Sequence, residues 1–243
     1  MFSVLDMFTI GVGPSSSHTV GPMVAAHAFA SSLQADHLVD RTARVKITLY
    51  GSLALTGLGH GTDRAAMAGL EGNLPATVDT DHMMHIREIC ALDDTLNLAG
   101  LKRIHFDYDR DVVFEQWKRM AAHPNGMRFQ AFDAAASLVD EQVWYSIGGG
   151  FVRKGAPEDP MIGIHERPPE GASFADADES SSTDFGVEAP YPFSSCTELV
   201  SLCREHHLSI AELVWANETA SRSGIQVRSD IDAIWRVMRA CVD

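Results

Sequence analysis

Basic residues are scarce in this sequence of 243 residues. Lys and Arg number 19 against 33 Asp and Glu, and the formal net charge is -14 at pH 7. Binding to nucleic acid or to an anionic membrane surface draws on clustered Lys and Arg, so we expect neither partner. Long apolar runs are missing as well, because no stretch approaches the length that spans a bilayer and no basic and apolar leader opens the chain. These absences predict a cytoplasmic protein.

Cysteine is sparse too. The sequence has 4 cysteines and no Cys-x-x-Cys pair, which excludes a secreted disulfide scaffold and predicts reduced thiols. Cys196 and Cys203 lie in a helical pattern that is more typical of two small core residues than of metal ligands. His82 and His85 could form a metal site with nearby acids, but without a His-Glu-x-x-His pattern a solvated segment is favoured. We therefore predict no metal ligand in this chain.

A crowded polar segment is present where common catalytic signatures are absent. The sequence contains no Walker lysine, no Rossmann glycine fingerprint and no nucleophile elbow. Residues 13–22 read GPSSSHTVGP and run directly into a largely apolar stretch, which predicts a helix start. The first turn of a helix presents unpaired N–H groups, and hydroxyls beside it can hold a carboxylate or phosphate. A Ser or Thr N-cap is the simpler alternative, but three serines followed by His18 and Thr19 exceed what one cap requires.

Three further segments also combine polar side chains with turn-forming glycine or proline. They are residues 56–63 (TGLGHGTD), 123–127 (HPNGM) and 145–150 (YSIGGG). Each alone is more often a simple turn, a hairpin or a bulge. Together with the opening segment they supply imidazoles, hydroxyls and an amide. This chemistry suits the binding of a small zwitterionic acid and the movement of a proton near neutral pH.

The pattern along residues 1–152 predicts one mixed α/β (α+β) domain with a mixed sheet. Alternating residues predict a strand at 45–50, and helical spacing predicts a helix at 64–70 after a glycine-rich loop. Further short strands are expected at 102–108, 111–114, 127–132 and 142–152, the last of them bent or exposed at its three glycines.

From residue 153 the amino-acid composition and the hydrophobic pattern change. Residues 153–190 predict an acidic linker, because few large apolar side chains are available there to offset the entropy of ordering. Capping boxes at Ser195 and Ser209 open two helices, and a third follows at 231–238. Residues 191–243 thus predict the start of an all-α domain. Its apolar faces are expected to need a larger body, with a self-contained small helical subdomain as the alternative.

The order of the polar motifs resembles that of the iron-sulfur-dependent L-serine dehydratases (L-serine ammonia-lyases) of the single-chain type. The resemblance rests on residues 11–23, 51–63, 123–127 and 145–152, and on the later segments 191–195 (YPFSS) and 215–218 (WANE). It covers the chain apart from the linker. It implies a beta-type substrate and base domain at 1–152, similar to an allosteric small-acid-binding domain, and the first helices of the alpha-type catalytic domain at 191–243.

The resemblance also implies a reaction, the conversion of L-serine to pyruvate and ammonia through aminoacrylate. In this family an open iron of a 4Fe-4S cluster acts as Lewis acid while a base removes the Cα proton. The cluster cysteines lie far into the helical domain, and none of the cysteines here stands in a matching motif. The chain is therefore expected to be truncated before the cluster-binding part and to be inactive alone. The family suggests a homodimer for the full-length protein.

Roles can be assigned within these motifs. His60 is the expected base, because its glycine neighbours leave the imidazole accessible, and His18 is the runner-up. The other candidates are expected to hold, orient or surround the substrate: Ser15, Ser16, Ser17, Thr19, His123, Asn125 and Ser146. The three consecutive serines cannot be ranked from sequence.

A second class of function stays open. Because the first domain is similar to a regulatory acid-binding domain, an isolated copy could bind a small acid such as serine without catalysis. The absent cluster ligands favour this binding module for the chain as it stands, whereas the site motifs favour the enzyme for its lineage.

Overall fold

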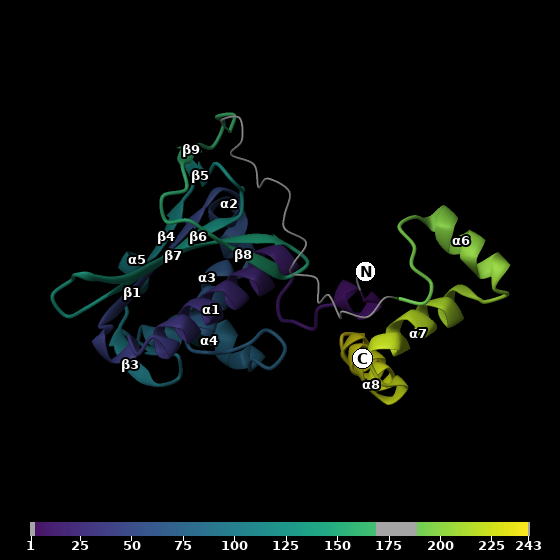
Figure 1. The fold of residues 1–243 in the computed structure, drawn as a ribbon. Helices are drawn as coiled ribbons and strands as arrows, with labels where there is room; N and C mark the ends of the chain where they lie inside the picture. Colours follow the sequence, from purple (N-terminus) through teal and green to yellow (C-terminus); the bar gives the residue numbers. More distant parts are fainter. Residues whose placement is uncertain (1–2, 169–188, 243) are drawn as a thin grey trace. The chain divides into compact units, whose positions relative to one another are not determined.

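The computed structural model describes residues 3–168 and 189–242, which belong to two compact units (Figure 1). Residues 11–168 form the α/β unit, and residues 3–10 group with the helices that follow residue 189. The expected domain boundaries at 152 and 190 stay predictions. The stretch 169–188 of the expected linker lies outside the described residues.

A mixed sheet forms the centre of the α/β unit. Among the described residues seven strands join in it, six of them in the order β2 (Thr95–Leu98), β3 (Lys102–His105), β1 (Arg44–Tyr50), β6 (Gly126–Phe132), β7 (Leu138–Gly148) and β8 (Phe151–Gly155). The remaining strand, β4 (Val112–Glu115), also pairs with β1. Strand β1 runs parallel to β3 and β4 and antiparallel to β6, so the expected mixed sheet is confirmed.

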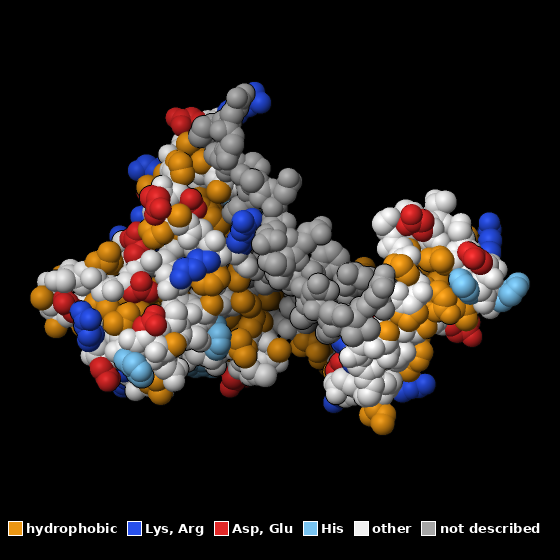
Figure 2. Space-filling model, viewed as in Figure 1, with side chains coloured by type: hydrophobic (Ala, Val, Ile, Leu, Met, Phe, Trp, Pro, Cys, Tyr) orange, Lys and Arg blue, Asp and Glu red, His pale blue; other side chains and the backbone are white. Residues whose placement is uncertain are grey.

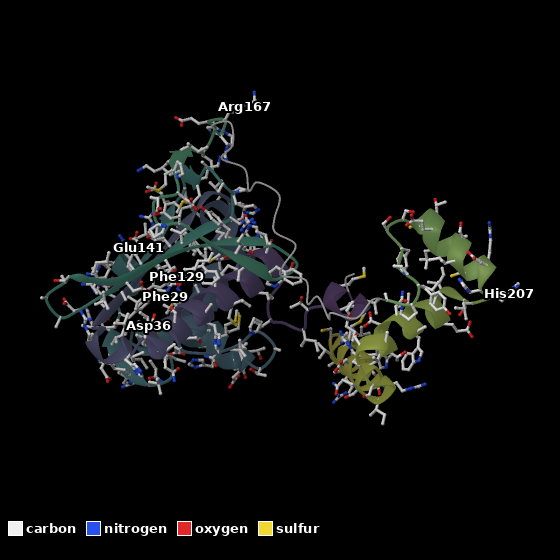
Figure 3. The ribbon with its side chains drawn as sticks, in the orientation of Figure 1. Phe29, Asp36, Phe129, Glu141, Arg167 and His207 are labelled. Atoms are coloured by element: carbon white, nitrogen blue, oxygen red, sulfur yellow. The ribbon has the colours of Figure 1, made fainter. Side chains whose placement is uncertain are left out.

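The helices of this unit are α1 (Gly21–Ala35), α2 (Gly51–His60), α3 (Thr62–Leu70), α4 (Thr80–Cys90) and the short α5 (Tyr108–Asp111). Helix α1 lies on the sheet through Phe29, whose ring stacks on Phe129 of β6 at 5.5 Å between centroids (Figure 3). Helix α3 approaches α1 so closely that a Cβ at Gly69 would stand 2.3 Å from the Met23 carbonyl oxygen. Fully burying a side chain such as Phe29 stabilises the fold by about 1.5–3 kcal/mol.

A second, smaller core lies under a two-stranded sheet. Strands β5 (Lys118–Met120) and β9 (Met161–Gly163) pair antiparallel, and Met120 and Tyr145 are fully buried in this core. The Tyr145 hydroxyl donates to Asp159 at 2.6 Å. Residues 153–155 continue β8 and residues 161–163 form β9, so these two stretches of the expected linker are strands. Pairing with distant strands satisfies backbone groups in a way that composition does not reveal.

The helical unit contains α6 (Cys196–Glu205), α7 (Ile210–Ser221), α8 (Gly224–Ala240) and the 3-10 helix Val4–Met7. The expected capping box is confirmed at Ser209. Ser195 caps α6 through its side chain, which confirms the N-cap half of the other expected box, and the Glu198 carboxylate accepts from the Ser194 N–H. Helix α8 begins at Gly224, before the expected residue 231, since Ser223 caps it. Hydrophobic side chains remain exposed on these helices (Figure 2). Trp235 is one of these exposed residues. In the described parts of the chain, no helix has both the length and the apolarity to cross a membrane.

Candidate active site

The opening polar segment forms a capped helical turn. Ser15 is the N-cap, and its Oγ accepts a hydrogen bond from the His18 N–H at 3.1 Å. The turn Ser16–Val20 is π-helical and continues directly into α1, with a proline in the first turn of α1. Thr19 is buried, whereas Ser16 is exposed. The predicted helix start is confirmed, and its serines lie at the end where main-chain N–H groups are unpaired.

Helix α2 carries His60 as its last residue. We expected a glycine-rich loop here, and the structure shows that this expectation is wrong: residues 51–60 form a helix that ends at the left-handed Gly61. The His60 Nδ1 lies 2.9 Å from the Thr56 carbonyl oxygen. A carbonyl oxygen only accepts, so Nδ1 carries the hydrogen and Nε2 of the neutral ring keeps a free electron pair. The tautomer of a potential base is thereby set by the backbone of its own helix.

The two candidate bases are neighbours in space. The rings of His18 and His60 lie 5.0 Å apart between centroids, inclined at 39°. Side-chain hydroxyls hold the two backbones together: Thr19 Oγ1 donates to the His60 carbonyl oxygen at 2.8 Å, and Thr62 Oγ1 donates to the His18 carbonyl oxygen. The pairing of these imidazoles is therefore fixed by two buried threonines.

The His18 ring has a hydroxyl at each nitrogen. Ser17 Oγ lies 2.9 Å from Nδ1, and Ser52 Oγ lies 3.0 Å from Nε2. Burial lowers the pKa of His18 below its ordinary value, and the nearby His60 lowers it further. A neutral imidazole next to a second imidazole suits a site that exchanges a proton near neutral pH.

Replacing His60 with glutamine removes one of the two causes that lower the His18 pKa. We expect the titration midpoint of His18, followed by NMR of the imidazole carbons, to rise in His60→Gln while burial keeps it below the ordinary 6.5. His123 is the internal control, because its pKa is lowered by burial alone. An unchanged His18 midpoint would mean that the two rings do not interact electrostatically.

The remaining two segments complete the cluster through hydrogen bonds. Ser146, at the end of β7, is buried, and its Oγ donates to the Ser17 carbonyl oxygen at 2.7 Å. Asn125 and Ser146 bond twice, from Ser146 N to Asn125 O at 3.0 Å and from Asn125 Nδ2 to Ser146 O at 3.2 Å. The Ser52 N–H donates to the Pro124 carbonyl oxygen at 3.0 Å, which ties α2 to the same turn.

His123 is held within its own turn. Its Nδ1 accepts from the Asn125 N–H at 3.1 Å, and its ring is inclined at 64° to the Tyr145 ring, with 6.3 Å between the centroids. Burial lowers the pKa of His123. The structure therefore brings the four predicted segments together, while the individual roles predicted for their residues stay predictions.

Sequence reasoning missed three polar residues of this cluster, Ser52, Thr56 and Thr62. Ser52 touches His18, Thr56 accepts from His60, and Thr62 donates to the backbone of His18. All three lie inside the quoted segment 51–63. Treating that segment as a loop hid them, since only a helix brings positions 52, 56 and 60 onto one face.

Metal-binding groups do not gather in the described residues, where no three His, Cys, Asp or Glu side chains are placed to hold a metal ion. The Cys90 thiol is buried, and burial raises its pKa to about 12. Cys196 is exposed, so the expectation of a core position is wrong for it. His82 and His85 lie in helix α4. The His82 Nε2 lies 2.6 Å from Glu71 Oε2. This set of donors does not fit a 4Fe-4S cluster, which needs convergent thiolates.

The two histidines with lowered pKa values predict how stability depends on pH. The unfolded chain binds a proton at each near pH 6.5, whereas the folded chain does so only at lower pH. The unfolded state therefore holds more protons just below pH 6.5, and stability falls as the pH drops through that window. We expect the urea midpoint to decrease from about pH 7 to about pH 5.5, and to decrease less in His123→Gln. An equal decrease in the variant would contradict the assignment.

Hydroxyls, main-chain amides and paired imidazoles thus gather at one helix start of an α/β domain with a mixed sheet. The chain belongs to the serine dehydratase beta chain family, whose family model matches residues 3–156.

Similarity extends along the whole chain. It is 43% identical over 241 residues to the L-serine dehydratase of Streptomyces coelicolor (strain ATCC BAA-471 / A3(2) / M145), covering 99% of this chain and 49% of that protein. It is 37% identical over 244 residues to L-serine dehydratase 1 of Escherichia coli (strain K12), covering 100% of this chain and 49% of that protein. The L-serine dehydratase of Helicobacter pylori (strain ATCC 700392 / 26695) is 36% identical over 242 residues, covering 100% of this chain and 48% of that protein. The chain thus spans about half the length of these relatives.

Proposed function

We propose that this chain supplies the substrate-binding and base-bearing half of an L-serine dehydratase. The complete enzyme would convert L-serine to pyruvate and ammonia through aminoacrylate. The observation that carries the proposal is the meeting of His18 and His60, with ring centroids 5.0 Å apart, beside the capped start of a helix. The names of the relatives supply the substrate.

In this proposal His60 removes the Cα proton. Its Nδ1 is occupied by the Thr56 carbonyl oxygen, so Nε2 is the atom that accepts the proton. The Cα–H electron pair forms the double bond of aminoacrylate as the Cβ–O bond breaks, and the leaving hydroxyl takes up a proton to become water. Aminoacrylate rearranges to the imine, and water hydrolyses the imine to pyruvate and ammonia.

The substrate carboxylate is proposed to bind at the opening turn. Ser16 is exposed, and Ser15 and Ser17 are half-buried at a helix start. Unpaired N–H groups and serine hydroxyls hold an anion there without any lysine or arginine. Thr19 and Ser146 already donate their hydroxyls to backbone carbonyls, which suggests that they position the turn. Asn125 and His123 are proposed to orient the substrate beside this turn.

The 4Fe-4S cluster implied by the family is proposed to lie in polypeptide that this chain does not include. It would supply Lewis-acid activation of the substrate hydroxyl when bound. The described donors do not fit it, so we assign no step to a cluster on this chain. A homodimer and a cytoplasmic location remain predictions.

A chimera tests the proposal. Residues 1–243 are joined to the part of the Streptomyces coelicolor relative that follows the matched half, the product is loaded with iron and sulfide under anaerobic conditions, and pyruvate and ammonia are measured. We expect equal amounts of both from L-serine, and none in the double variant His18→Gln, His60→Gln.

The second candidate is a module that binds a small acid without catalysis. It is favoured by the capped helix start, because serine hydroxyls and main-chain N–H groups can hold a carboxylate without any catalytic step. Calorimetric titration of residues 1–243 with L-serine, together with the chimera assay, separates the two candidates. A loaded chimera that forms no pyruvate, while the chain alone binds L-serine, would establish the module and overturn the enzyme.

A further inference from the structure

The N-terminal residues bond to a buried glutamate of helix α7. Ser3 Oγ donates to Glu218 Oε2 at 2.7 Å, and the Val4 N–H donates to Glu218 Oε1 at 2.7 Å. Ser3 Oγ in turn accepts from the Leu5 N–H at 3.1 Å. Both carboxylate oxygens are thus bonded, one by Ser3 and one by the first residue of the 3-10 helix Val4–Met7, across 215 and 214 positions of sequence.

These hydrogen bonds matter for stability because the Glu218 carboxylate is buried. Glu218 is only 6% exposed and Ser3 only 5%. A buried carboxylate is costly unless hydrogen bonds replace its hydration. The N-terminal segment supplies two short ones, and Arg222, the C-cap of α7, lies farther away, with Nη2 at 3.9 Å. Removing residues 3 and 4 would therefore leave the Glu218 carboxylate poorly compensated.

Asn217, the residue of α7 before Glu218, binds a second segment, at Tyr191, by hydrogen bonds. Asn217 is buried, its Oδ1 accepts from the Tyr191 N–H at 2.9 Å, and its Nδ2 donates to the Tyr191 carbonyl oxygen at 2.9 Å. Adjacent polar side chains thus bind the main chains of two segments far apart in sequence. Main-chain groups on extended or turn segments are what a peptide-binding site recognises.

We propose that Glu218 of α7, beside the Asn217 that holds Tyr191, forms a peptide clamp whose ligand is the N-terminal segment, residues 3–7 of this chain. The clamp holds residues 3–7 within the helical unit, and these residues continue along the chain into the α/β unit at Gly11, so they form a second link besides the covalent connection through residues 169–188. It follows that the two units stay together when that connection is cut. The proposal does not rest on the proposed catalytic activity.

Cleavage of the full chain tests the clamp. A protease recognition sequence is inserted between residues 175 and 189, a tag follows residue 243, and the cleaved protein is analysed by gel filtration and tag capture. We expect the fragment beginning at residue 1 to be retained by the tagged helical fragment. Deleting residues 1–9 abolishes the retention.

Val4 offers a sharp variant pair. Val4→Pro removes the N–H that reaches Glu218, at the first position of a helical turn where the φ of proline is tolerated. Val4→Ala is the matched control, because it shortens the side chain but keeps the N–H. We expect the dissociation constant of the cleaved fragments to rise about tenfold in Val4→Pro relative to Val4→Ala, the scale of a hydrogen bond to a charged group.

Glu218→Gln repeats the test from the other side of the contact. It keeps the shape of the side chain but loses the charge, and the exposed Glu205→Gln is its control. Hydrogen exchange of the Val4 and Leu5 amides in the uncut chain reports the contact even where a cleaved variant unfolds. Fragments that separate in the unsubstituted protein, or that stay together without residues 1–9, would overturn the clamp.

Discussion

In a complete enzyme built on this chain, His60→Gln is expected to lower kcat by about a hundredfold or more while changing KM little, the usual scale for removing a general base. Glutamine keeps bulk and a hydrogen-bonding end, so the packing of α2 is retained, but its amide cannot accept a proton near neutral pH. The measurement is pyruvate formation from L-serine over a range of substrate concentrations, with the chimera as reference.

His18→Gln and Ser16→Ala are the informative comparisons. His18 lies between the Ser17 and Ser52 hydroxyls, and its backbone is fixed by Thr62. If His18→Gln abolished turnover while His60→Gln kept a near-normal kcat, the roles of the two imidazoles would be reversed. Ser16→Ala is expected to act mainly through KM, because an exposed hydroxyl that binds the carboxylate interacts alike with ground state and transition state.

The mixed α/β architecture could be predicted because its signals are local. Residues 45–50 alternate and form β1, and residues 64–70 have helical spacing and lie in α3. The four polar segments could be predicted as one site from their chemistry and from the family resemblance. The segments are held together by hydrogen bonds from side-chain hydroxyls to main-chain carbonyls, such as Thr19 to His60 and Ser146 to Ser17. Local sequence patterns do not predict which hydroxyl bonds which carbonyl.

Helix α2 shows why other parts could not be predicted. Its glycines lower helix propensity and suggest a loop, but Gly57 packs so closely that a Cβ would stand 3.2 Å from Phe114 and from Thr62. Tertiary contact thus selects glycine within a helix. In the same way β9 depends on pairing with β5, and Ser3 depends on Glu218. Contacts between positions far apart in the chain decided each of these cases.

Gly51→Ala is expected to be the most damaging single substitution in the scaffold of the site. Gly51 has a φ of 54°, which an L side chain rarely adopts, and a Cβ there would stand 2.4 Å from the Pro124 carbonyl oxygen. That carbonyl accepts from the Ser52 N–H, so the clash opens the joint between α2 and the turn that carries Asn125. Backbone strain and overpacking each cost about 1–3 kcal/mol. Together they lower the unfolding temperature by roughly 10 °C in a chain of this size.

Two glycines of the same region separate strain from clash. Gly61 also has a positive φ, 64°, but a Cβ there meets nothing within 4 Å, so Gly61→Ala carries the strain alone. Gly59 has neither constraint, and Gly59→Ala is expected to be neutral or stabilising by up to about 1 kcal/mol through helix propensity. Thermal unfolding followed by circular dichroism gives the ranking, with Gly51→Ala least stable and Gly59→Ala most stable. Equal losses in Gly51→Ala and Gly61→Ala would show that the turn at Pro124 yields, and that the joint between α2 and this turn is not what holds the His60 helix in place.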